Sequence, residues 1–306
     1  MKIFVLAPKE DWICDRQAHE WNTANPSLCV TNPADADVIW LLAGWCWNQI
    51  PVQILLSKKV VLSVHHIVPE KFDRSKILEF QYRDNFVDAY HVPNKTTHNH
   101  IRQLTKKPIL TVPFWFDSSI WHPIDKTNSR KELGIKEDEF IIGSFQRDTE
   151  GGTGLPKLEK GPDLFCDLIK KIKDEGLVQN PRVLLGGWRR SYVIDRLKKM
   201  NIDYTYFELV PLETIKKMYA SCDLYVVSSR YEGGPQAVLE ASAMNVPIIS
   251  RDVGIAKSVL SPSCVMDIPI EFSIPSSESI AKNYNTVLGY EIHNLKKNFI
   301  EMFESV

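Results

Sequence analysis

Short apolar runs that alternate with segments of helical spacing constrain the fold of this chain more than any other feature. The polar and apolar positions within these runs do not alternate strictly, which is typical of strands covered by helices on both faces. The sequence therefore predicts an α/β fold with doubly wound parallel sheets. The expected strands are residues 2–7, 37–43, 59–64, 89–93, 109–114, 140–145, 182–187, 204–209, 224–229 and 246–251.

A polar segment near residues 116–138 divides the expected strands into two groups of similar size. We therefore expect a Rossmann-like N-terminal domain at 1–116, a linker at 117–134 and a second Rossmann-like domain at 135–270. Residues 271–306 are expected to form helices that partly cross back to the N-terminal domain. Two such domains would face each other across a cleft, where the carboxyl ends of both sheets meet.

The charge and composition exclude several classes of function. The 306 residues carry a net charge of only −1, which argues against broad nucleic-acid binding. The apolar run at 3–7 is too short for a signal peptide, and no apolar stretch is long enough to span a membrane. The scattered lysine pairs would support at most a weak association with a membrane surface. The six cysteines form no C-x-x-C pair, so we expect reduced thiols and a cytoplasmic protein.

The stretch SSRYEGGPQAVLEASA, residues 228–243, places two glutamates around an expected helix start. Gly233 and Gly234 would let the backbone approach a ligand, and Pro235 suits the first position of a helix. The free N–H groups of that helix start would bind phosphate. Glu240 would lie about 7.5 Å further along the helix, where it suits ribose hydroxyls, and Glu232 would lie on the sugar side. The alternative is a capped surface helix with two solvated acids.

The end of the expected strand 140–145 supplies cations. Arg147 follows this strand directly, and Lys160 precedes the next helix. Fixed Arg and Lys side chains can neutralise a departing diphosphate without a metal ion. Lys157 is an alternative to Lys160. The GGTG segment at 151–154 lacks the G-K-[ST] ending of a phosphate-binding loop, so we interpret it as an ordinary loop.

Three segments together resemble the retaining glycosyltransferases of family 4, which have the GT-B fold. They are GSFQR with EKGPDLF, VLLGG, and LETIKKMYASCDLYVVSSRYEGGPQAVLEASAMNVPIISRDVG. The last contains the family's E-x7-E signature, here Glu232 to Glu240. The similarity covers most of residues 138–260 and is thin in the first half of the chain. The resemblance implies a GT-B fold, retention of anomeric configuration, and no bound metal or other cofactor.

The resemblance also implies roles for individual residues. Glu240 would bind the ribose, and Glu232 would hold hydroxyls of the transferred sugar. Arg147 and Lys160 would stabilise the departing diphosphate, and His65 matches a histidine near the donor sugar and the acceptor. The residues expected to line the donor are Gly143, Ser144, Gly233, Gly234, Pro235 and Gln236.

Several other side chains have competing interpretations. His65 and His66 are adjacent in an extended segment, so only one can reach the cleft, and we favour His65. Trp45 and Trp47 follow the strand 37–43, where aromatic faces would suit stacking on an acceptor sugar. The aspartates of DAD at 35–37 precede that strand and are expected to be solvated. The tryptophans expected in the core are Trp40, Trp115 and Trp121.

These observations predict a retaining glycosyltransferase that moves a sugar from a nucleotide-diphosphate sugar to a hydroxyl acceptor. The acceptor is a glycan, a glycolipid or a small molecule, and the base, sugar and acceptor are not specified by the sequence. The alternatives are a nucleotide-sugar epimerase or a sugar phosphorylase of the same fold, or a non-catalytic nucleotide-sugar binder.

Overall fold

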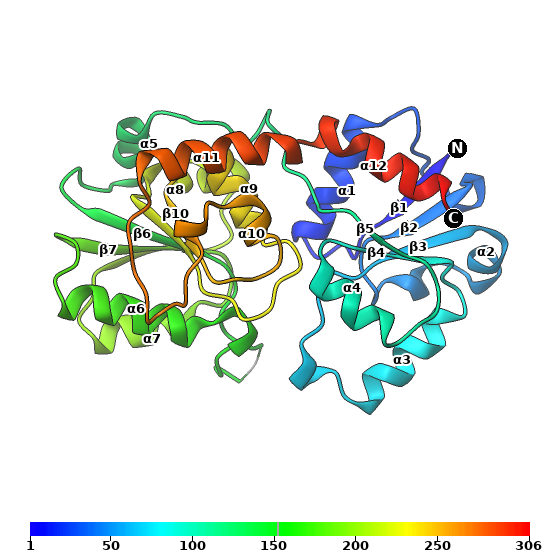
Figure 1. Cartoon of the computed structure of the whole chain (residues 1–306), viewed down its shortest axis with the longest axis horizontal. Helices are drawn as coiled ribbons and strands as arrows, with labels where there is room; N and C mark the ends of the chain where they lie inside the picture. Colours follow the sequence, from blue (N-terminus) through cyan, green and yellow to red (C-terminus); the bar gives the residue numbers. More distant parts are fainter. Residues whose placement is uncertain (152) are drawn as a thin grey trace. The chain divides into compact units, whose positions relative to one another are not determined.

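The computed structural model describes residues 1–151 and 153–306, which form two compact units. The first unit contains Met1–Asp117 and Tyr290–Val306, and the second contains Ser118–Gly289. Of the GGTG segment at 151–154, Gly152 lies outside the described residues. Each unit is built on one five-stranded parallel sheet (Figure 1), which confirms the prediction of an α/β fold with two Rossmann-type halves.

The sheet of the first unit follows the order of the chain, β1-β2-β3-β4-β5. Its register pairs Ile3 with Val38 and Val38 with Lys59, so the first three strands start level with one another. The strands are β1 (Ile3–Leu6), β2 (Val38–Leu41), β3 (Lys59–Ser63), β4 (Ala89–Val92) and β5 (Ile109–Thr111). The helices of this unit are α1 (Ile13–Ala24), α2 (Val52–Ser57), α3 (Arg74–Asp84), α4 (Lys95–Arg102) and α12 (Ile292–Glu304).

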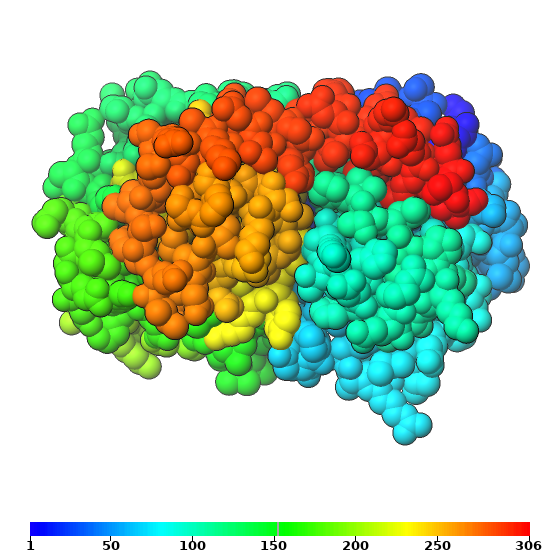
Figure 2. Space-filling model, viewed as in Figure 1, coloured from blue at the N-terminus to red at the C-terminus, as the bar shows by residue number. Residues whose placement is uncertain are grey.

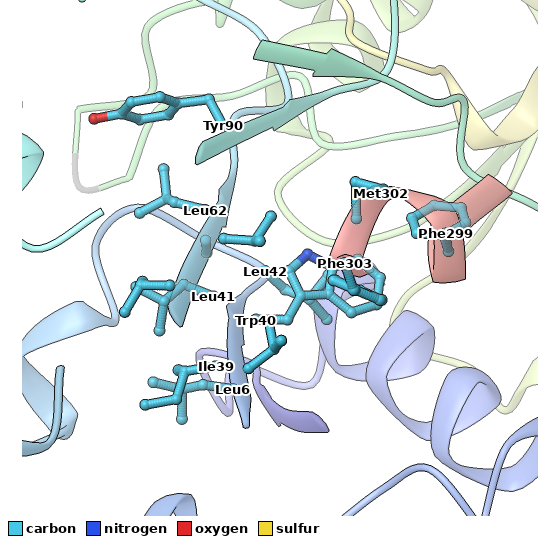
Figure 3. Close-up of a cluster of buried hydrophobic side chains, with 14 of the residues drawn as sticks. Leu6, Ile39, Trp40, Leu41, Leu42, Leu62, Tyr90, Phe299, Met302 and Phe303 are labelled. Atoms are coloured by element: carbon cyan, nitrogen blue, oxygen red, sulfur yellow. The ribbon is translucent and has the colours of Figure 1, made fainter. Parts of the chain in front are cut away.

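An aromatic cluster joins the C-terminal helix to the first sheet. Trp40 of β2 is fully buried, with its ring centroid 5.3 Å from Phe299 and 5.2 Å from Phe303, both on α12. Figure 3 shows the side chains of Trp40 and Phe303 pointing toward one another. Trp21 and Trp115 complete the cluster. Because aromatic rings bury large areas, the inner face of α12 belongs to the core of this unit. The outer face of the helix is exposed and is seen in red in Figure 2.

The sheet of the second unit has the order β10-β9-β6-β7-β8. The chain therefore builds outward from β6 through β7 to β8, returns to β9 on the other side of β6, and continues to β10. In Figure 1, α6 and α7 cover one face of this sheet, and α8, α9 and α11 cover the other. The strands are β6 (Phe140–Phe145), β7 (Pro181–Gly186), β8 (Tyr204–Phe207), β9 (Leu224–Val227) and β10 (Ile248–Ser250). The helices are α5 (Lys126–Leu133), α6 (Pro162–Asp174), α7 (Ser191–Lys199), α8 (Leu212–Ser221), α9 (Gln236–Ala243), α10 (Ala256–Val259) and α11 (Ser277–Val287).

The segment at 117–134, expected as a linker, is largely packed against the second unit. The ring of Trp121 lies 5.6 Å from that of Tyr219, and both are buried. The guanidinium of Arg130 donates from Nε and Nη2 to the carbonyl of Ser221 at 3.1 and 3.0 Å. The division between the units therefore falls at residue 117 and again near residue 290.

All the strands that the sequence predicts are present, and most are shorter at their ends than the apolar runs. Trp40, Trp115 and Trp121 are buried as expected. The six cysteines are free thiols. Within the described part of the chain, no helix combines the length and the apolar character needed to cross a membrane.

Candidate functional site

The candidate site lies where the strand order of the second sheet reverses, between β6 and β9. β6 pairs with β9 on one side and with β7 on the other, so the carboxyl ends of β6 and β9 are neighbours that lead into different loops. Ligands of open α/β sheets bind at such a point, outside the carboxyl ends of the strands. Gln146 and Arg147 follow β6, and the segment from Ser228 to Pro235 connects β9 to α9.

An ion pair joins the two loops. Nζ of Lys160 lies 2.6 Å from Oε1 of Glu232, and the two side chains are only 20% and 12% exposed. The hydroxyl of Ser229, which is fully buried, donates to the same carboxylate oxygen at 2.9 Å. Charge-assisted bonds in a largely buried place are stronger than their exposed counterparts. The position of the Glu232 carboxylate is therefore fixed by two donors from different loops.

The backbone of Lys160 is also held in place by hydrogen bonds. Its carbonyl accepts from Nε2 of Gln146 at 3.0 Å and from Oγ of Ser228 at 3.3 Å. The other lysine considered from the sequence, Lys157, instead lies 3.5 Å from Glu159. The structure thus pairs Lys160 with Glu232 and places Lys157 elsewhere in the loop.

Glycine allows the backbones of these two loops to approach each other. Gly161 follows Lys160 directly, has a φ of +61°, and a Cβ added to it would lie 2.0 Å from the carbonyl oxygen of Ser228. Gly254 has a φ of +60°, and a Cβ there would lie 2.5 Å from the carbonyl oxygen of Gly233. Since no other residue fits these positions without movement, both glycines fix the shape of the loop that carries Glu232.

Helix α9 begins at Gln236, one residue later than the sequence suggested, because Pro235 is its N-cap residue and not its first helical residue. Pro235 makes no side-chain cap bond to this helix, and the N–H of Val238 in the first turn donates to the carbonyl of Pro235 at 2.8 Å. Glu240, on the same helix, is only 6% exposed and accepts from the hydroxyl of Tyr219 at 2.8 Å. One helix therefore has the positive end of its dipole at its start and a held carboxylate one turn later.

Beyond the carboxyl end of β6, a buried ion pair ties the loop after β6 to the loop after β7. Nε of Arg190 donates to Asp148, and both side chains are fully buried. Nη1 of Arg190 also donates to the carbonyls of Gly186, at 2.8 Å, and of Ser144. No feature of the sequence indicated this pair, since neither residue lies in a recognisable motif.

Gly143 and Ser144, which were expected to line the nucleotide-sugar donor, lie inside the sheet. Ser144 is buried, and its hydroxyl accepts from Nη2 of Arg190 at 3.2 Å. A Cβ on Gly143 would lie 2.5 Å from Sγ of Cys222, so this glycine makes room for the next layer of the core. These contacts are internal to the protein, and the donor contacts of both residues stay predictions.

Arg147 lies beside an aromatic residue that the sequence interpretation did not use. Its Cζ is 5.3 Å from the ring centroid of Trp188, and the Cζ of Arg189 is 3.7 Å from the same ring. Trp188 is 38% exposed. Cations over an indole face are attracted by its π-electrons, so the ring helps to orient Arg147 at the end of β6.

The remaining candidates belong to the first unit. Nε2 of His65 donates to the carbonyl of Leu42 at 2.8 Å, and its ring stacks on Phe114 at 5.0 Å. Trp45 is 56% exposed and donates from Nε1 to Glu10 at 2.9 Å.

Trp47 stacks on the ring of Phe86 at 5.5 Å, so part of its surface is used within the unit. His66 is partly buried. Asp37 accepts from the backbone N–H of Lys2 at 2.7 Å, a structural role at the start of β2. In the described residues, no group of three or more His, Cys, Asp and Glu side chains is placed to hold a metal ion.

Comparison with known proteins agrees with this arrangement. The family model described as "Glycosyl transferases group 1" matches residues 125–301, which include both glutamates and all the strands of the second unit. The alpha-galactosylglucosyldiacylglycerol synthase of Streptococcus pneumoniae is 24% identical over 165 residues, covering 51% of this chain and 41% of that protein. The lipopolysaccharide core biosynthesis mannosyltransferase LpsB of Rhizobium meliloti is 28% identical over 141 residues, 43% of this chain and 37% of LpsB. The chain thus spans less than half the length of these two relatives.

The fold as a whole also has solved counterparts. The structure of Anabaena HepE in complex with UDP-glucose superposes with a TM-score of 0.74 at 13% identity, over 99% of each chain. Such low identity shows a shared fold alone. The fold is the GT-B fold of glycosyltransferases, as the sequence predicted.

Proposed function

Because the chain belongs to the glycosyl transferases group 1 family, we propose that it is a retaining glycosyltransferase with a nucleoside-diphosphate sugar as its donor. The observation that carries this proposal is the ion pair between Lys160 and Glu232 beside the start of α9. It brings a cation suited to a diphosphate and a carboxylate suited to sugar hydroxyls to one place. The names of the relatives, which include a glycolipid synthase and a mannosyltransferase, support sugar transfer.

The donor would bind along the start of α9. Its diphosphate would lie at the N–H groups of the first helical turn, where the helix dipole favours negative charge. Lys160 and Arg147 would provide positive charge to the same phosphates. Glu240 would accept hydrogen bonds from ribose hydroxyls on one side, and Glu232 would accept from hydroxyls of the sugar on the other. The complex of the structural neighbour HepE with UDP-glucose supports this donor class.

In the proposed reaction, the bond between the anomeric carbon and the diphosphate oxygen breaks as the acceptor oxygen forms its bond to that carbon. The acceptor attacks from the face that the diphosphate leaves, so the anomeric configuration is retained. The acceptor's proton passes to an oxygen of the released diphosphate. Lys160 and Arg147 would stabilise the negative charge that develops on the leaving group, without need of a metal ion.

The test is release of nucleoside diphosphate from a panel of nucleotide sugars, with and without acceptors extracted from cells. We expect release to depend on the acceptor, and the anomeric proton of the product, observed by NMR, to show the configuration of the donor. Glu232→Ala serves as the inactive control. Formation of an epimeric nucleotide sugar without acceptor, cleavage that requires phosphate, or binding without turnover with every acceptor would each contradict the proposal in favour of another function.

A further inference from the structure

The contact between Tyr219 and Glu240 joins α8 to α9 inside the second unit. The phenol oxygen lies 2.8 Å from Oε2 of Glu240, and the side chains are 1% and 6% exposed. A carboxylate oxygen only accepts, so Tyr219 is the donor. One oxygen of the Glu240 carboxylate is therefore directed inward, toward the core.

The environment of Tyr219 keeps both its proton and its position. Burial raises its pKa well above the ordinary value of a tyrosine, and the negative charge of Glu240 raises the pKa further, so the phenol stays a donor. Its ring lies 4.8 Å from that of Phe145, 5.0 Å from that of Tyr225 and 5.6 Å from that of Trp121. A ring enclosed on several sides cannot swing away without opening this cluster.

We propose that Tyr219 is a positioning residue that fixes the Glu240 carboxylate for the ribose of the donor, and that this contact sets a preference for ribonucleotides over 2′-deoxyribonucleotides. The inference rests on the proposed function, in which Glu240 accepts hydrogen bonds from ribose hydroxyls. Those hydroxyls have fixed positions once the diphosphate is bound at the start of α9. Only a carboxylate held in one rotation can meet them.

The preference follows from the burial of Glu240. A site built to bond a hydroxyl rejects a ligand that lacks it, because the buried polar group then loses a partner. Without the phenol, the Glu240 carboxylate can rotate and find hydrogen-bond partners within the protein. The absence of the 2′-hydroxyl from the ligand then reduces its affinity less. Tyr219→Phe should therefore weaken binding of the ribonucleotide much more than binding of the deoxyribonucleotide.

The experiment measures the dissociation constants of UDP, GDP and ADP and of their 2′-deoxy counterparts by calorimetry with the full chain. The nucleotide that the wild type binds most tightly is then used for the variants. We expect the wild type to prefer the ribose form by on the order of tenfold to a hundredfold. Tyr219→Phe should reduce that ratio at least about fivefold. Tyr192→Phe is the matched control, since its hydroxyl accepts from Arg196 on α7 at 3.2 Å, and its ratio should equal that of the wild type.

A second variant tests the idea independently of the folding of Tyr219→Phe. Glu240→Asp keeps the charge but shortens the side chain, so it cannot reach the phenol and the ribose together, and the ratio should fall. Suppose that Glu240→Gln loses the preference for ribose, but Tyr219→Phe or Glu240→Asp keeps the full ratio. This result would overturn only the role of Tyr219. A wild type that binds both forms equally, or a full ratio in Glu240→Gln, would instead overturn the ribose role of Glu240 in the proposed function.

Discussion

Nζ of Lys160 lies 2.6 Å from Oε1 of Glu232, and the hydroxyl of Ser229 lies 2.9 Å from the same oxygen. The proposed function assigns Lys160 to the diphosphate and Glu232 to the sugar, yet the two side chains are already paired with each other. An ammonium group has three donors, so Lys160 can keep this bond while it also binds a phosphate oxygen. The pair would then couple the two ends of the donor.

The first prediction separates the roles of these two residues. Glu232→Ala should reduce transfer more than about a hundredfold and leave the affinity for nucleoside diphosphate within about tenfold, because the lost contacts are to the sugar. Lys160→Met should lower that affinity by about tenfold or more, because a charge-assisted bond to the phosphates is lost. Calorimetry with the nucleoside diphosphate and a diphosphate-release assay measure the two effects.

Lys157→Met is the matched control for the lysine. Lys157 lies three residues earlier in the same loop, pairs with Glu159 and should leave affinity nearly unchanged. If Glu232→Ala lost nucleotide affinity while Lys160→Met kept it, the assignment of the two ends of the donor would be reversed.

The strands and the start of α9, beside which the candidate site lies, could be predicted because they depend on local patterns. Continuous apolar runs mark buried parallel strands, and the glycine-rich segment before Gln236 marks a helix start. The partners of the site residues could not be predicted in this way. Ser229 and Tyr219 are ordinary members of a strand end and a helix, and only the pairing of β6 with β9 brings Ser229 beside Gln146.

The buried ion pair of Arg190 and Asp148 could not be predicted from the sequence for a similar reason. The residues are 42 positions apart, and a charged residue in a sequence is usually solvated. The apolar residues of α12 recur at helical spacing, which is typical of a helix with one buried face. The tryptophans that receive this face, Trp40 among them, lie in the first half of the chain and become its neighbours only in the folded unit.

The second prediction concerns Gly161, which allows close contact between the two loops of the site. Gly161→Ala should destabilise the protein by roughly 3 kcal/mol or more, because the left-handed backbone is strained and the new Cβ meets the carbonyl of Ser228. Gly176→Ala is the matched control. It has a φ of +60° with no atom within 4 Å of the added Cβ, and should cost only about 1 kcal/mol.

Thermal unfolding of both variants, together with their affinity for nucleoside diphosphate, measures the difference. Gly161→Ala should also weaken nucleotide binding, since Lys160 is the preceding residue. Equal losses of stability in the two variants would show that backbone strain, and not the contact with Ser228, determines the need for glycine at 161.

The third prediction concerns the ion pair of Arg190 and Asp148. Asp148→Asn should destabilise the protein by about 3–5 kcal/mol, because it leaves the guanidinium buried without its counter-charge. Asp174→Asn, in the exposed pair with Lys170 on α6, should change stability by no more than about 0.5 kcal/mol. Urea unfolding compares the two variants, and similar small losses would mean that the bonds of Arg190 to backbone carbonyls are sufficient on their own.

The last prediction concerns pH and His91 of β4. Nε1 of Trp40 donates to Oγ of Ser63 at 2.8 Å, the Ser63 hydroxyl lies 2.8 Å from Nδ1 of His91, and Nε2 of His91 lies 2.7 Å from the carbonyl of Val112. The carbonyl can only accept, so Nε2 carries the proton, and Nδ1 accepts from Ser63. This chain of bonds satisfies a neutral imidazole, and a second proton on Nδ1 would require the Ser63 hydroxyl to turn its own proton away from His91.

Burial lowers the pKa of His91 from 6.5 to about 4, against the smaller opposing effect of the Val112 carbonyl. The stabilisation from a neutral His91 is therefore fully present above pH 6.5 and is lost as the pH falls from 6.5 to 4, by about 3 kcal/mol in total. His91→Asn should lower the melting temperature at pH 7.5, and its deficit relative to the wild type should shrink toward pH 4. His293→Asn, at an exposed position on α12, should follow the wild type at every pH. A deficit of His91→Asn that stayed constant from pH 7.5 to pH 4 would mean that His91 accepts a second proton in the folded protein as readily as in the unfolded chain.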